Sequence, residues 1–248
     1  MPYFKLFDFF YLHVPKTGGT SIEDYFYSKL GTMFRQRDEY TMYGLYLDKT
    51  KEIRVPNERS LHHFTYLEIL QNSKYLDKVF TKTEKEVTTG MDVVRQVNDL
   101  SALPAVLNLH RCKYKVISVR NPFDRILSEL FWRKGITDTS TKEEVEEKIR
   151  HYLQTGTKSN TDNHITPQYQ FLLDESGNPI SNIHIIRTET LTEDMHTLSF
   201  KDFNMFRNKT MSDKINYREL LNENAVKMIC DYYADDFAYF GYSTDANV

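Results

Sequence analysis

Short apolar runs recur along the chain, and each is followed by a turn or a polar segment. They cover residues 6–14, 114–119 and 182–186. Continuous apolar runs of this length are typical of strands that are buried on both faces in a parallel sheet. Longer stretches between them place apolar residues three or four positions apart, which predicts helices. The pattern therefore indicates an α/β fold with a central parallel sheet flanked by helices.

The helical stretches follow the runs or separate them. Helices are expected over residues 20–30, 60–76, 91–109, 123–134, 142–153, 187–198 and 217–233, with an aromatic tail over 237–242. Strand, turn and helix follow one another twice, as neighbouring units of a parallel sheet do. Neither an internal repeat nor a linker interrupts the pattern, so we expect a single domain over residues 1–248.

Composition and charge exclude several classes of protein. The 248 residues are 40% apolar and carry a net charge of −3, so we expect a packed core and no nucleic-acid partner. Cys112 and Cys230 do not form a disulfide framework or a redox motif. The apolar N-terminal stretch is too short to cross a bilayer and lacks the basic start of a signal peptide. We therefore expect no membrane span and a cytoplasmic location.

The first stretch with chemical character joins a predicted strand to a helix. From His13 to Ser21 it reads HVPKTGGTS. The backbone can bend at Gly18 and Gly19, and the first N–H groups of the new helix then face the bend. Lys16 adds a positive charge. Such a turn is suited to bind phosphate or sulfate.

This turn differs from the usual nucleotide-binding P-loop, because Lys16 precedes both glycines instead of following the second one. It resembles the 5′-phosphosulfate loop of sulfotransferases that use 3′-phosphoadenosine-5′-phosphosulfate (PAPS). The resemblance implies that Lys16 reaches the bridging oxygen that leaves with the nucleotide. It also implies that backbone N–H groups and hydroxyls hold the donor, and these belong to Thr17, Gly18, Gly19, Thr20 and Ser21.

A second motif follows the next predicted strand. Arg120 ends that strand, and Ser128 lies one to two turns into the following helix. Ligands of open α/β sheets bind beyond such strand ends, so the Arg120 guanidinium and the Ser128 hydroxyl can bind one phosphate. The segment resembles the 3′-phosphate-binding segment of the same sulfotransferases. Arg125, between them, is expected to be a charge on the helix surface.

Further segments extend the resemblance over nearly the whole chain, to the Golgi-type carbohydrate (heparan 2-O and chondroitin) sulfotransferases and their bacterial relatives. They cover residues 61–65, 162–168, 186–194, 207–210 and 232–242. The resemblance implies a P-loop-like three-layer sandwich and transfer of a sulfuryl group from PAPS to an acceptor hydroxyl, expected on a glycan. It also implies that Lys209 lies in a loop that closes over the nucleotide. We expect no transmembrane anchor of the kind that the animal Golgi enzymes carry.

A histidine is the expected base for the acceptor proton. We favour His63, because the resemblance to the heparan 2-O-sulfotransferases implies a catalytic histidine in its segment. His62 is adjacent, and the sequence does not separate the two. His164 and Glu23 remain alternatives, whereas His13 is expected to be a packed or hydrogen-bonded residue. The histidines lack the spacing of metal ligands, so we expect no metal.

Two other functions stay open. An ATP-using P-loop kinase is disfavoured by the position of Lys16 and by the lack of a Mg²⁺-binding carboxylate at a strand end. A catalytically inactive nucleotide- or glycan-binding module would bind the nucleotide but transfer no sulfate. The sequence does not identify the acceptor. Residues 32–59 and the loop 156–170 can stack a sugar ring or bind a peptide or a lipid headgroup.

Overall fold

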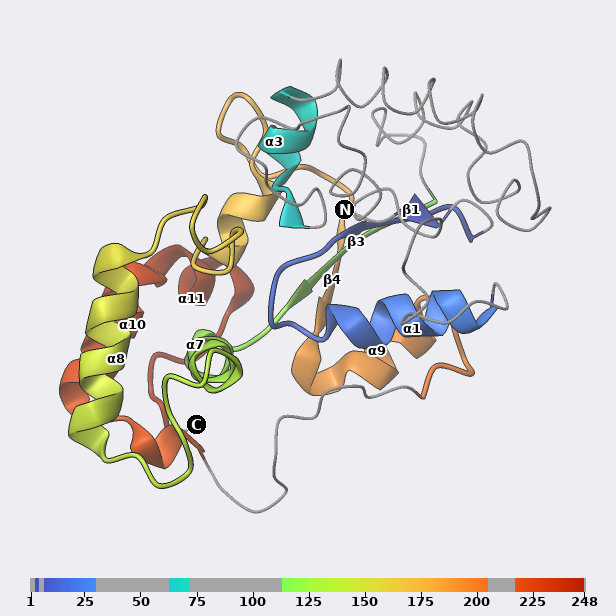
Figure 1. Ribbon diagram of the computed structural model, residues 1–248. Coiled ribbons are helices and arrows are strands. Elements are labelled where there is room, and N and C mark those ends of the chain that lie inside the picture. Colours follow the sequence, from blue (N-terminus) through green and yellow to red (C-terminus); the bar gives the residue numbers. More distant parts are fainter. Residues whose placement is uncertain (1–2, 5–6, 30–62, 72–112, 205–216, 248) are drawn as a thin grey trace, which may run out of the picture.

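A mostly parallel sheet forms the centre of the molecule (Figure 1). The computed structural model describes residues 3–4, 7–29, 63–71, 113–204 and 217–247. The strands are β1 (Tyr3–Phe4), β2 (Phe9–Leu12), β3 (Tyr114–Val119) and β4 (His184–Arg187), in the order β1-β2-β3-β4. β2, β3 and β4 run parallel, and β1 pairs with β2 in the antiparallel sense. The expected parallel sheet is confirmed, and the antiparallel edge strand is added to it.

A helix follows each parallel strand. These helices are α1 (Gly19–Lys29) after β2, α7 (Pro122–Trp132) after β3 and α9 (Leu191–Thr197) after β4. The other α-helices among the described residues are α3 (Tyr66–Gln71), α8 (Lys142–Thr155), α10 (Glu223–Tyr232) and α11 (Ala234–Phe240). Shorter 3₁₀ turns are η7 (Gln168–Leu172), η8 (Thr188–Thr190) and η9 (Tyr217–Leu220). No helix in the described ranges is long and apolar enough to cross a membrane.

Some predicted helices differ from the observed ones. Within the described part of 60–76, the helix begins only at α3, because the Thr65 side chain accepts a hydrogen bond from the Glu68 N–H (3.2 Å) and caps it. Residues 187–198 divide into the end of β4, η8 and α9. The predicted helix 91–109 lies outside the described residues.

The C-terminal part also differs. The predicted helix 217–233 divides into η9 and α10, because the side chain of Asn222 caps a new helix by accepting from the Ala225 N–H (2.9 Å). The segment expected as an aromatic tail is helical as α11, which ends at Gly241 with a φ of 68°. Glycine adopts this left-handed conformation without strain.

Both faces of the sheet are buried. The side chains of Phe9 and Tyr11 pack on the face that α1 and α9 cover, and Ile22 and Phe26 of α1 join the same apolar cluster (Figure 1). Alternate strand residues face the opposite side and are also fully buried, namely Phe10, Leu12 and Ile117. Burial on both faces explains the continuous apolar runs in the sequence.

A second apolar cluster joins the helices that lie to one side of the sheet. It is formed by α7, α8, α10 and α11, and it includes Phe123, Leu127, Val145, Ile149 and Phe237. In Figure 1 these helices gather at one end of the molecule, with α7 nearest the sheet. The cluster thereby fixes α7, the helix that follows Arg120, against the end of β3.

Candidate active site

The turn between β2 and α1 has the backbone geometry of an anion-binding loop. Gly18 has a φ of 84°, and its carbonyl oxygen accepts from the Ser21 N–H at 2.9 Å. Lys16 also lies in the left-handed region, with a φ of 69°, which costs a residue with a Cβ about 1–2 kcal/mol. Strain of this kind is retained where the surrounding structure holds it, often at functional sites. Lys16 and Thr20 are half-buried at this turn.

The hydroxyl of Thr17 has a different role from the expected one. It donates to the carbonyl oxygen of Val14 (2.8 Å) and lies 2.5 Å from the Ser118 hydroxyl of β3. The side chain is fully buried. We therefore correct the expected role of this hydroxyl: it ties the loop to the sheet, and Thr17 is left with its backbone N–H for an anion.

Arg120 lies directly beside the loop, because β2 and β3 are hydrogen-bonded neighbours. Its Nη1 donates to the carbonyl oxygen of Lys16 at 3.5 Å. Burial lowers the pKa of Arg120, and the carboxylates of Asp124 and Glu189 oppose this shift. A buried guanidinium remains charged and gains from a bound anion. The two predicted donor-binding cations are thus brought together.

The backbone of Arg120 is clamped by a buried amide. The Gln168 side chain accepts from the Arg120 N–H (2.8 Å) and donates to the Arg120 carbonyl oxygen (2.9 Å). Asp236 of α11 accepts in turn from the backbone N–H groups of Gln168 (2.9 Å) and Tyr169 (2.8 Å). Gln168 and Asp236 have no exposed surface. The C-terminal helix therefore helps to position the arginine at the end of β3.

Ser128 and Arg125 share helix α7. Ser128 is 6% exposed and lies on the second turn, as expected. The expectation that Arg125 is a surface charge is wrong, because the side chain is 3% exposed. Its guanidinium donates to the carbonyl oxygens of Pro15 (3.1 Å) and His164 (2.8 Å). Arg125 therefore joins the anion-binding loop to the segment that carries His164.

Three imidazole rings form a row beside the loop. The ring centroids of His13 and His63 are 5.1 Å apart, and those of His63 and His164 are 4.9 Å apart, each pair edge to face. His13 enters the row from the end of β2, and the other two come from segments far away in the sequence. The row brings the favoured base, one alternative base and the histidine expected only to pack into one cluster.

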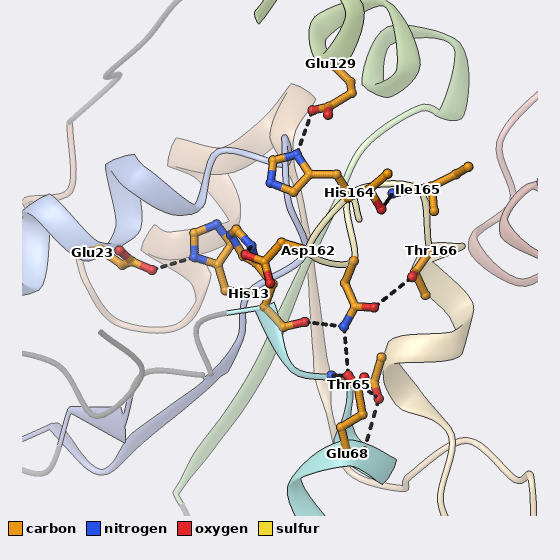
Figure 2. A network of polar contacts seen from close by, with 12 residues as sticks. His13, Glu23, Thr65, Glu68, Glu129, Asp162, His164, Ile165 and Thr166 are labelled. Carbon is orange, nitrogen blue, oxygen red and sulfur yellow. Dashed lines mark hydrogen bonds and ion pairs between the residues drawn. The ribbon is translucent and has the colours of Figure 1, made fainter. Parts of the chain in front are cut away.

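Each of these rings is held by its own carboxylate. The Nδ1 atom of His13 lies 2.5 Å from Glu23, and that of His164 lies 2.6 Å from Glu129 (Figure 2). The Nδ1 atom of His63 lies 2.8 Å from Asp162. A carboxylate on Nδ1 fixes the tautomer that carries its proton there and leaves Nε2 to accept another.

His63 is set apart by its low basicity. Burial lowers its pKa to about 4, and the neighbouring His13 and His164 lower it further, while the hydrogen bond to Asp162 opposes them. His63 is therefore neutral at neutral pH and can take up a proton. Glu23 is fully buried and bound to His13. This contact favours a supporting role for Glu23 over that of the base.

The segment before His164 positions His63. Asp162 and Asn163 have positive φ values of 49° and 63°. The Asn163 side-chain amide donates to the His63 carbonyl oxygen (2.8 Å) and to Glu68 of α3 (2.7 Å). The sequence gives no sign of the partnership between Asp162 and His63, because 99 positions separate them. The partnership between Glu129 and His164 was not predicted for the same reason, since 35 positions separate them, although Glu129 directly follows Ser128.

Lys16 extends away from the loop toward the end of α7. Its Nζ lies 5.2 Å from the ring centroid of Trp132, whose ring in turn stacks on His164. Burial lowers the pKa of Lys16, and the carboxylate of Glu129 opposes this effect. The ammonium group therefore lies near the end of α7, over the indole that stacks on His164.

Two predicted site residues, His62 and Lys209, lie outside the described residues. The described part of the chain contains no group of three or more His, Cys, Asp or Glu side chains placed to hold a metal ion.

A comparison with known proteins identifies the family of this chain. The model of the sulfotransferase family matches residues 5–243, nearly the whole chain. Neither the curated proteins nor the solved structures give a significant match. The match includes the loop, Arg120 and the histidine row described above, and the parallel sheet with its flanking helices is consistent with the fold of that family. The chain belongs to the sulfotransferase family.

Proposed function

We propose that the protein transfers a sulfuryl group from PAPS to a hydroxyl group of a carbohydrate. One observation supports this proposal above the others. The cations of Lys16 and Arg120 lie at neighbouring strand ends, joined through the Lys16 carbonyl oxygen, and a histidine–carboxylate row adjoins them. Membership of the sulfotransferase family supports sulfuryl transfer as the reaction. The donor PAPS and the carbohydrate acceptor are our inference.

The residues at the site suit a nucleotide with two separate anionic groups. The loop offers the backbone N–H groups of Thr17 to Thr20, which include the first of α1, to the 5′-phosphosulfate. Arg120, with Ser128 on the next helix, would bind the 3′-phosphate. Burial lowers the pKa of both Lys16 and Arg120. Because burial penalises their charged forms, a bound polyanion would stabilise both cations.

The transfer step needs a base and a stabilised leaving group. The acceptor oxygen attacks sulfur, and its O–H proton passes to Nε2 of His63. The bond from sulfur to the bridging oxygen breaks, and the electron pair leaves with 3′-phosphoadenosine 5′-phosphate (PAP). Lys16 would offset the charge that develops on this oxygen. Asp162 would stabilise the imidazolium that forms on His63.

Binding and turnover together test the proposal. Calorimetry should show that the protein binds PAP more tightly than ATP with Mg²⁺, and labelled sulfate should pass from PAPS to a glycan. Lys16→Ala should reduce turnover roughly 10²- to 10³-fold, by analogy with the loss of one transition-state donor. Lys227→Ala is the matched control, because that side chain is 74% exposed on α10.

Three results would contradict the proposal. Preference for ATP with Mg²⁺ would favour the kinase alternative. Tight PAP binding without sulfate transfer to any acceptor would favour the inactive binding module. Near-normal turnover of the Lys16→Ala variant would exclude the assigned role of that lysine.

A further inference from the structure

Trp132 is an exposed aromatic residue beside the buried side chains of the candidate active site. It is the only tryptophan of the chain and the last residue of α7. Its exposed fraction is 59%, the largest among the exposed large hydrophobic residues in the described part of the chain. The preceding turn of the same helix carries Ser128 and Glu129, which are 6% and 1% exposed. The indole therefore lies at the edge of the candidate active site and faces solvent.

The ring is nevertheless held in one orientation. It stacks on the His164 ring, with centroids 5.3 Å apart and an interplanar angle of 21°. His164 is itself fixed, because Glu129 binds its Nδ1 and Arg125 binds its carbonyl oxygen. An aromatic platform that is already ordered loses little conformational entropy when a ligand stacks on it.

The platform lies within reach of the proposed chemistry. The Lys16 ammonium, which we assign to the leaving oxygen, is 5.2 Å from the indole centroid. The histidine under the ring touches His63, the proposed base. A ligand on Trp132 would therefore lie next to both the sulfuryl donor and the base, which is the position of the acceptor.

We infer that Trp132 is the platform on which a pyranose ring of the acceptor stacks. This inference rests on the proposed function and specifies the substrate class of the same site. The C–H face of a sugar packs on the electron-rich face of an indole, while its hydroxyl groups remain at the rim for hydrogen bonding. Arg133, which binds the buried Glu129, provides a polar partner beside the ring.

The surroundings of Trp132 favour a sugar over an apolar acceptor. Small apolar ligands bind in concave pockets that are walled mostly by hydrophobic side chains. Trp132 instead is 59% exposed, and the cations of Lys16 and Arg133 lie over its ring, 5.2 and 5.7 Å from the centroid. A polyhydroxylated ring needs one flat apolar face and polar partners around it, as this site provides.

Lys16 and the sugar would occupy the indole in turn. The ammonium lies over the ring as a cation–π contact. When PAPS binds, the same ammonium turns to the bridging oxygen and leaves the ring to the acceptor. The nucleotide is therefore expected to strengthen acceptor binding.

The emission of the sole tryptophan gives a direct test. The protein is titrated with unsulfated chondroitin, heparosan and chitin hexasaccharides, with and without saturating PAP, and with p-cresol as a phenolic probe. We expect a saturable change of the emission with at least one saccharide, at lower concentration when PAP is present. Trp132→Ala should raise the KM for that saccharide about 10- to 100-fold, as truncation of a binding tryptophan does.

Matched variants separate stacking from a general loss of structure. Trp132→Phe keeps an aromatic face and should keep the KM within about threefold, while both variants bind PAP like the wild type. Tyr239→Ala removes another exposed aromatic ring (43% exposed) on α11 and should leave the KM unchanged.

The outcomes that overturn this inference are distinct from those that overturn the proposed function. An unchanged emission with every saccharide in a protein that binds PAP would exclude the platform. A wild-type KM in Trp132→Ala, or a response to p-cresol alone, would do the same. Failure of the wild type to bind PAP would instead overturn the proposed function, and this inference with it.

Discussion

Gly19 can be tested most sharply, because a single added carbon would strike the histidine row. A Cβ at this position would lie 2.3 Å from Nε2 and 2.5 Å from Cε1 of His13. Ordinary Cβ contacts are 3.4 Å or longer, so the ring would have to retreat by about 1 Å. His13 is 5% exposed and held by Glu23, and its ring packs on His63. The imidazole therefore has little space into which it can move.

Two effects determine the change in stability on Gly19→Ala. Overpacking of a well-packed core costs about 1–3 kcal/mol of the free energy of unfolding. Alanine is preferred over glycine within helices by about 0.5–1 kcal/mol, which offsets part of this cost. We expect a net loss of about 1–2 kcal/mol. A shift of about 1 Å in the histidine row should also reduce turnover by on the order of 10²-fold.

A double-mutant cycle with His13→Ala isolates the clash. Urea unfolding of the wild type, both single variants and the double variant gives the coupling energy, which should be about 1–3 kcal/mol. In the His13→Ala background, Gly19→Ala should instead stabilise the protein by about 0.5–1 kcal/mol, because only the helical preference for alanine remains. Gly135→Ala is the matched control, because its Cβ would lie 3.6 Å from the nearest atom, the Leu130 carbonyl oxygen. Additive effects of the two substitutions would refute the proposed contact.

Two further predictions follow from buried charges. Arg125→Lys keeps the charge but cannot reach both carbonyl oxygens, of Pro15 and His164, so it should lower the free energy of unfolding by about 1–3 kcal/mol. Arg150→Lys is the control, because that side chain lies on the exposed face of α8 and is 39% exposed. Equal losses of the two variants in urea unfolding would contradict this prediction. For His63, folding lowers the pKa from 6.5 to about 4. Between pH 6.5 and about pH 4, this histidine is therefore protonated in the unfolded chain and neutral in the folded protein. The free energy of unfolding should therefore fall as pH drops from about 6.5 to about 4, and less steeply in His63→Asn; parallel pH profiles of the two proteins would exclude the shift.

The sequence identified the elements that depend on local rules. The apolar runs predicted the three parallel strands, because a strand buried on both faces needs apolar residues throughout. Gly18 predicted a turn, and its φ of 84° agrees. Lys16 and Arg120 were each predicted to bind the donor, and they lie together because each follows a parallel strand, and such strand ends meet at one edge of a sheet.

Local sequence patterns were misleading, or carried no signal, where the environment of a side chain decided its role. Arg125 has the pattern of a surface charge on an amphipathic helix, yet carbonyl oxygens from two distant segments surround it. Thr17 was expected to bind the donor through its hydroxyl, which instead donates to Val14. Both outcomes depend on contacts that no local pattern encodes.

The two halves of the candidate site therefore have different origins. The anion-binding loop is determined by the sequence itself, since its glycines and its helix start are neighbours along the chain. The histidine row exists only in the tertiary structure. His13, His63 and His164 meet because the sheet and α7 bring three segments together, and two of the three carboxylates lie 35 and 99 positions from their histidines. Hydrogen bonding and burial act through distance in space, so only the folded chain could show which carboxylate holds each histidine and that burial lowers the pKa of His63.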